Sequence, residues 1–114
     1  MMESLSSGDF ENGRLRREGT WLVAFLADWC PFCRRFRPTF AAVDGGSTFR
    51  TGVADVTSES SELWEMFEID VVPTVLVFRE GAPMVRVDSI PGFGLPPGGL
   101  EHAVAAARRE PSPS

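Results

Sequence analysis

The chain has 114 residues, 43% of them hydrophobic, which is enough for one domain with a real core and too few for two. Its net charge of −5 and the lack of a basic block argue against nucleic acid or an anionic membrane as its partner. No segment has the length of a membrane span, and 1–18 carries charges where a signal peptide would be apolar. We therefore expect a cytoplasmic protein.

The sequence divides into three parts. Residues 1–8 form an N-terminal segment long enough for a short first strand, 9–109 form a single domain, and 110–114 form a disordered tail. At the start of the domain, 9–18 predict a modest helix that is weakened by a glycine in its middle. The near-continuous apolar run 21–27 then predicts a strand buried on both faces.

The only two cysteines follow this strand, in the motif Trp-Cys-Pro-Phe-Cys at 29–33. Residues 31–43 predict a helix with Pro31 at its first position, where the missing N–H costs nothing, and Cys30 at its N-cap. The unpaired N–H groups of a helix start favour a thiolate at Cys30. Cys33 lies one turn further on, within reach of Cys30. Three nearby cations would add to this effect, namely Arg34, Arg35 and Arg37.

A dithiol that makes and breaks disulfides is the interpretation we prefer for this pair. Half of a zinc site is one alternative, but zinc takes four ligands and His102 is the only other soft ligand. A static structural disulfide is another, but so small a loop would hardly constrain the unfolded chain. The sequence thus predicts redox chemistry without a metal or an organic cofactor.

The remaining predicted elements are a strand at 49–56, a helix at 58–67, the two strands of a hairpin at 74–78 and 84–88, a loop at 91–99 and a last helix at 100–107. Pro38 should kink the helix after the cysteines, and Arg79 and Arg86 are expected to be surface charges of the hairpin. The order β-α-β-α-β-β-α contains one right-handed crossover followed by the hairpin. It predicts an α/β fold with a central mixed sheet flanked by helices on both faces.

Three features together resemble thioredoxin: the motif at 29–33, Pro38 five residues after the second cysteine, and Val72-Pro73-Thr74 before a strand, turn and strand. The resemblance covers roughly 5–108. It implies the thioredoxin fold and a thiol–disulfide oxidoreductase that reduces protein disulfides. In that activity Cys30 would be the nucleophile and Cys33 the resolving cysteine.

The resemblance also implies where substrate binds. Pro73 would be a cis-proline facing the active-site disulfide, although a Val-Pro bond taken alone is only occasionally cis. Without the resemblance, a trans proline opening an edge strand would be the expectation. Gly92 would line the substrate groove. The implied set of substrate-binding residues is Trp29, Pro31, Phe32, Val72, Pro73, Thr74 and Gly92.

Two positions beneath the site depart from the thioredoxin pattern. Most thioredoxins carry a buried aspartate where this chain has Ala24, and a lysine where it has Asp55. That aspartate is proposed to move a proton to or from the resolving cysteine, and an alanine cannot do so. We hypothesise that Asp55, on the neighbouring strand, projects into the same volume and relays the proton. The alternative is that Asp55 is an exposed strand-end residue without a role.

The Pro31-Phe32 pair departs as well, because glycine followed by proline is usual in thioredoxins. A proline that stabilises the Cys30 thiolate would make the protein more oxidising. A thiol oxidase or isomerase of the same fold, or a redox-sensing or protein-binding module with little turnover, therefore remains as an alternative. The expected partners are protein disulfides and a disulfide reductase that donates electrons, and we expect a monomer.

Overall fold

The computed structural model describes residues 2–109 and contains a five-stranded mixed sheet in the order β1-β5-β4-β6-β7. The tail predicted at 110–114 lies outside the described residues. Strands β1, β5 and β4 are parallel to one another, and β6 is antiparallel to both β4 and β7. Their bounds are β1 (Met2–Leu5), β4 (Thr20–Leu26), β5 (Arg50–Asp55), β6 (Thr74–Arg79) and β7 (Ala82–Val87). The N-terminal segment therefore supplies one edge strand.

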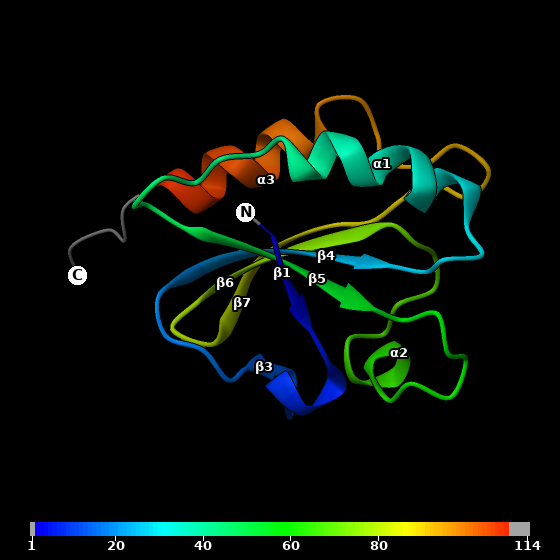
Figure 1. Cartoon of the computed structure of the whole chain (residues 1–114), viewed down its shortest axis with the longest axis horizontal. Helices are drawn as coiled ribbons and strands as arrows, with labels where there is room; N and C mark the ends of the chain where they lie inside the picture. Colours follow the sequence, from blue (N-terminus) through cyan, green and yellow to red (C-terminus); the bar gives the residue numbers. More distant parts are fainter. Residues whose placement is uncertain (1, 110–114) are drawn as a thin grey trace.

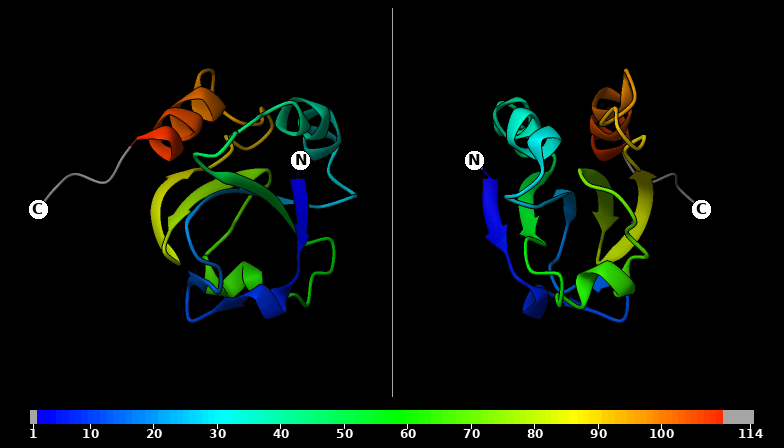
Figure 2. Two further views of the ribbon diagram at one scale, coloured as in Figure 1. Left: turned by 60° about the vertical axis from the view of Figure 1, so that its left-hand side comes forward. Right: turned by 90° about the vertical axis from the view of Figure 1, so that its right-hand side faces the viewer.

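Helices cover both faces of this sheet (Figure 1). Helices α1 (Pro31–Ala41) and α3 (Gly99–Arg108) lie over one face, and α2 (Leu63–Met66) lies over the other. A small hairpin of β2 (Phe10–Glu11) and β3 (Arg14–Leu15) shares the second face with α2, as the two views of Figure 2 show. The predicted α/β architecture is confirmed.

Strand β4 forms the middle of the core, and its residues from Leu22 onward are fully buried. Phe25 of β4 packs in a cluster whose ring centroids lie 5.2–5.9 Å apart, formed with Phe10, Phe67 and Phe78. Because neighbouring strand residues point to opposite faces, Ala24 faces the other side, where α1 and α3 lie. Aromatic packing therefore holds the hairpin and α2 to one face of the sheet.

The helix predicted at 9–18 is wrong. A short 3₁₀ turn, Ser7–Asp9, is followed there by the β2–β3 hairpin. Asn12 and Gly13 join its strands with φ values of 51° and 78°. Two consecutive residues of positive φ make the tight turn that Asn-Gly favours between antiparallel strands. The Asn12-Gly13 dipeptide is typical of a hairpin turn, and the structure has a hairpin there.

The helix predicted at 58–67 is too long, because α2 covers only Leu63–Met66. The serine hydroxyls before α2 accept hydrogen bonds from backbone N–H groups two residues further on. Ser60 N donates to Ser58 Oγ at 3.3 Å, and Leu63 N donates to Ser61 Oγ at 3.3 Å. Serine hydroxyls compete with helical hydrogen bonds in this way. The chain enters α2 through turns rather than through helix.

The other predicted elements agree with the structure to within two or three residues at their ends. Pro38 lies inside α1, which continues to Ala41. Arg79 was expected to be a surface charge, but its guanidinium donates to the carbonyl of Ala106 at 3.3 Å. It therefore ties β6 to the last turns of α3.

Candidate functional site

The structure confirms Cys30 as the N-cap of α1, with Pro31 at the first helical position. The backbone N–H of Cys33 points back and donates to Cys30 Sγ, with 3.4 Å between nitrogen and sulfur. An N–H group at a helix start that is aimed at a sulfur stabilises negative charge on it. The local backbone thus prepares Cys30 to carry a thiolate.

Cys33 has a different environment, although both thiols are free and buried. Only 1% of Cys33 is exposed, and burial raises the pKa of its thiol to about 12. The N–H of Ala27, 3.5 Å from Cys33 Sγ, and the Arg37 guanidinium act in the opposite direction. Burial is the larger effect, so the Cys33 thiol stays protonated near neutral pH.

A groove of about 190 Å³ opens beside Cys30. It brings together four of the predicted substrate-binding residues from three parts of the chain. Its lining consists of Trp29, Cys30, Phe32, Trp64, Asp70, Val71, Val72, Ser89, Ile90, Pro91, Gly92 and Gly94. Trp29, Phe32, Val72 and Gly92 thus lie where the resemblance implied. Pro31, Pro73 and Thr74 are not among the lining residues.

The Val72–Pro73 peptide bond is cis, as the resemblance implied. Cys30 Sγ donates to the carbonyl oxygen of Val72 at 3.5 Å, which places this bond against the dithiol. Thr74 is fully buried, and its hydroxyl donates to the carbonyl of Val71 at 2.7 Å. Thr74 therefore braces the bend before β6 instead of facing the groove.

Trp29 and Trp64 form a stacked pair at one side of the groove. Their ring centroids are 6.2 Å apart and the rings are inclined by only 12°. Both indole N–H groups bind backbone carbonyls: Trp29 donates to Thr57 at 2.9 Å and Trp64 to Ser58 at 3.1 Å. Trp64 and Asp70 are not among the predicted site residues, because neither belongs to the cysteine motif or to Val72-Pro73-Thr74, although Asp70 stands two residues before Val72.

Asp55 lies exposed at the end of β5, and one carboxylate oxygen accepts a hydrogen bond from Thr57 N at 2.8 Å. The expectation that its side chain projects beneath the thiols is therefore not met. The carboxylate lines a surface hollow together with Asp28 and Thr57. The groups that shift the pKa of Cys33 are Cys30, Ala27 and Arg37, with no carboxylate among them. Ala24 itself is fully buried.

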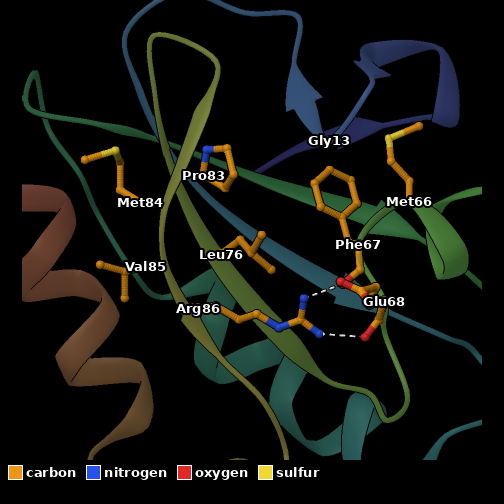
Figure 3. Close-up of a pocket in the computed structure, with 9 residues that line it drawn as sticks. All are labelled: Gly13, Met66, Phe67, Glu68, Leu76, Pro83, Met84, Val85 and Arg86. Atoms are coloured by element: carbon orange, nitrogen blue, oxygen red, sulfur yellow. Dashed lines mark hydrogen bonds between the residues drawn. The ribbon is translucent and has the colours of Figure 1, made fainter.

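A larger hollow of about 340 Å³ lies between the end of α2 and β7 (Figure 3). It is lined by Gly13, Met66, Phe67, Glu68, Leu76, Pro83, Met84, Val85 and Arg86. Arg86 crosses it and donates to the carbonyls of Phe67 and Glu68, the latter at 2.9 Å. Arg86 is exposed, as expected of a surface charge, and it is also a bridge between β7 and the end of α2. No cysteine lines this hollow, so the dithiol chemistry belongs to the smaller groove.

Within residues 2–109, no group of three His, Cys, Asp or Glu side chains is arranged to hold a metal ion. None of the helices described in this range is long and apolar enough to cross a bilayer. The chemistry that the site offers is that of two thiols at a helix start beside a cis-proline. This combination defines a dithiol protein of the thioredoxin class.

The thioredoxin family model matches residues 1–99, so the chain belongs to the thioredoxin family. It is 29% identical over 87 residues to a thioredoxin of Chlamydia pneumoniae, covering 76% of this chain and 83% of that protein. It is 32% identical over 81 residues to protein disulfide-isomerase A3 of Gallus gallus, covering 68% of this chain. The chain spans 15 to 29% of the length of several curated relatives that it matches.

Solved structures show the same fold. The short form of spinach chloroplast thioredoxin f superposes with a TM-score of 0.74 at 19% sequence identity, covering 95% of this chain and 94% of that one. The predicted thioredoxin fold is therefore confirmed over nearly the whole chain.

Proposed function

We propose that this chain is a thiol–disulfide oxidoreductase that reduces protein disulfides. One observation carries the proposal: Cys30 caps α1, receives the Cys33 N–H on its sulfur, and opens onto a groove beside the cis Val72–Pro73 bond. The groove exposes large apolar side chains next to the sulfur, which suits a segment of a protein substrate. Cys30 is the nucleophile, Cys33 resolves, and the groove residues hold the substrate.

The reaction consists of two exchange steps. The Cys30 thiolate attacks one sulfur of a substrate disulfide, forming a mixed disulfide and releasing the other substrate sulfur as a thiolate, which takes a proton from solvent. Cys33 then loses its proton and attacks Cys30 Sγ, which closes the Cys30–Cys33 disulfide and releases the second substrate thiol. The substrate gains two electrons and the dithiol loses them. An external disulfide reductase returns the two electrons.

The second step is the demanding one, because a thiol with a pKa of about 12 must be deprotonated. Ala24 supplies no carboxylate for this, and Asp55 is exposed. Asp55 as proton relay remains a proposal that Asp55→Ala tests. Loss of mixed-disulfide resolution with unchanged substrate binding supports it, and unchanged kinetics overturns it.

Three further proposals complete this function. The chain acts as a monomer, in the cytoplasm, with a disulfide reductase as its electron donor. The dithiol itself supports the compartment and the electron donor, since a pair of thiols that works by exchange suits a reducing compartment. The arginines beside the site, Arg34, Arg35 and Arg37, also favour partners with acidic surfaces.

The test of the activity is the reduction of a generic protein disulfide by the reduced chain. Cys30→Ser abolishes reduction. Cys33→Ser stops the reaction at the mixed disulfide, which accumulates and is seen by mass spectrometry. A Cys30→Ser variant with full activity overturns the assignment of the nucleophile, and failure of the unaltered chain overturns the proposed function.

An oxidase or isomerase role is the second candidate, and Pro31 at the first position of α1 favours it. The midpoint potential of the Cys30/Cys33 couple separates the two candidates. A value near about −270 mV is that of an ordinary thioredoxin, whereas a value above about −200 mV belongs to an oxidant or isomerase. A redox-sensing module with little turnover, which Ala24 favours, is distinguished by selective trapping of one partner together with poor reduction of generic disulfides.

A further inference from the structure

The groove beside Cys30 is mostly apolar and has one charged side chain in its lining. Trp29, Trp64, Val72 and Ile90 line it together with the carboxylate of Asp70, and no Arg or Lys is among the lining residues. Asp70 is exposed, and no ion pair or side-chain hydrogen bond joins it to another residue within 2–109. Its carboxylate is thus an acidic group without a partner among the described residues, at the edge of the groove beside Cys30.

The cations near the site have other partners than Asp70. Arg34 donates to the carbonyl of Asp28 at 2.9 Å, and Arg37 lies 3.7 Å from the Asp28 carboxylate. Arg35 lies over the ring of Phe32, 5.5 Å from its centroid, on α1. Among the described residues, none of the three forms an ion pair with Asp70, which comes from the segment between α2 and β6.

We propose that Asp70 selects substrates that carry a cationic side chain, Lys or Arg, next to the disulfide cysteine that Cys30 attacks. The inference rests on the proposed function. A guanidinium or ammonium in the groove pairs with Asp70 and lies near the Trp29–Trp64 pair, whose rings also attract cations. An acidic side chain at the same place meets Asp70 as a like charge. Asp70 is therefore a specificity-determining residue that takes no part in bond making.

The experiment compares two short peptide disulfides that differ only in an Arg or a Glu beside one cysteine. The kcat/KM for each is measured with the unaltered chain, Asp70→Asn and Asp70→Lys, at low and high salt. Glu11→Gln is the matched control, because Glu11 is an exposed carboxylate of β2 that does not line the groove.

We expect the unaltered chain to prefer the Arg peptide by about fivefold at low salt, as a partly exposed ion pair allows, with the preference shrinking at high salt. Asp70→Asn brings the ratio close to one, Asp70→Lys inverts it, and Glu11→Gln leaves it in place. The change falls mainly on KM.

Equal kcat/KM for the two peptides with the unaltered chain overturns the inference and leaves the proposed function standing. So does an equal loss of preference in Glu11→Gln, since net charge would then be the cause. If neither peptide is reduced by any variant or by the unaltered chain, the proposed function itself fails.

Discussion

Cys30 and Cys33 lie one helical turn apart but differ in chemical character. The sulfur of Cys30 borders the groove and receives a backbone N–H, whereas Cys33 is 1% exposed with a pKa raised to about 12 by burial. Thiolates, not thiols, react with alkylating reagents. An alkylating reagent should therefore react with the two cysteines at different rates.

We expect iodoacetamide at about pH 8 to modify Cys30 in the folded, reduced protein and to leave Cys33 intact. Peptide mass spectrometry after quenching measures the two sites separately. In denaturant both cysteines should react at similar rates, which is the control. Equal labelling of the two in the folded state would contradict the environments described.

Ala24 offers a second prediction at the same scale. Ala24→Asp places a carboxylate on the α1 side of β4 and should accelerate resolution of the mixed disulfide near neutral pH, because it supplies a proton acceptor. The buried carboxyl should also lower the free energy of unfolding by roughly 1–3 kcal/mol. Ala24→Asn, similar in shape without the acidic proton, is the control. Stopped-flow resolution that is no faster in Ala24→Asp than in Ala24→Asn contradicts the prediction.

The site could be predicted from sequence where one short motif determines it. The positions of Cys30 and Cys33 follow from helix-start chemistry, and Pro73 and Gly92 follow from the family pattern. The prediction for Asp55 could not be made reliably from sequence, because its place in the strand alone does not say whether a side chain at a strand end points toward the core or toward water. Trp64 reaches the groove only through the tertiary fold. Asp70 lies two residues before the Val72-Pro73 motif, but the motif does not say that the Asp70 side chain lines the groove.

Among the elements, α2 is too short to be stable by itself, since its four residues allow barely one turn. It is held from both ends: Leu63 and Phe67 are buried, and Arg86 of β7 binds the carbonyls just after the helix. The same guanidinium is anchored by Asp88, with 2.9 Å between Arg86 Nε and the nearer oxygen. Strand β7 therefore fixes the position of α2, which carries Trp64.

Arg86→Ala should lower the free energy of unfolding by roughly 1–3 kcal/mol, because it leaves backbone carbonyls of 67 and 68 without their charged donor. Arg86→Lys should recover only part of the loss, since an ammonium cannot match the planar fork. Arg16→Ala, at an exposed arginine, is the matched control. Denaturant unfolding followed by far-UV circular dichroism measures all three, and equal midpoints for Arg86→Ala and Arg16→Ala would contradict the bridge.

Helices and strands could be predicted from the sequence where burial determines the pattern of apolar residues. They could not be predicted where local hydrogen bonds determine the backbone conformation. The apolar runs that form β4 and β6 are unmistakable because both faces of these strands are covered. At 9–18 the hydrophobic spacing suited a helix, but the Asn12-Gly13 turn and the burial of Phe10 and Leu15 against the sheet favour a hairpin. At 58–62 serine hydroxyls outcompete the helix.

For the molecule as a whole, the amino-acid composition leaves only the thiols to titrate over a range of alkaline pH. The chain has no tyrosine and no lysine, so thiols are the only side chains with ordinary pKa values between about 8 and 12. Folding raises the pKa of Cys33 from 9.0 to about 12. The unfolded chain therefore loses this proton first as the pH rises, and the stability linked to it is complete below pH 9 and is lost on the way to pH 12.

We thus expect the free energy of unfolding of the reduced protein to fall from about pH 9 upward by roughly 1 kcal/mol per pH unit. Equilibrium unfolding in urea at a series of pH values under reducing conditions measures it. Cys33→Ala removes the titrating group and should flatten the profile. An unchanged slope in Cys33→Ala would mean that another group causes the alkaline loss.

The stacked indoles beside the nucleophile give the protein an optical signature of its own. Two of its three tryptophans, Trp29 and Trp64, are nearly parallel at 6.2 Å at the edge of the groove, and the third, Trp21, is buried within β4. Transition dipoles this close couple, so the pair should yield an exciton couplet in circular dichroism that Trp21 does not share. Because both indoles line the groove, a segment that binds against them should change this signal and so report occupancy without a label.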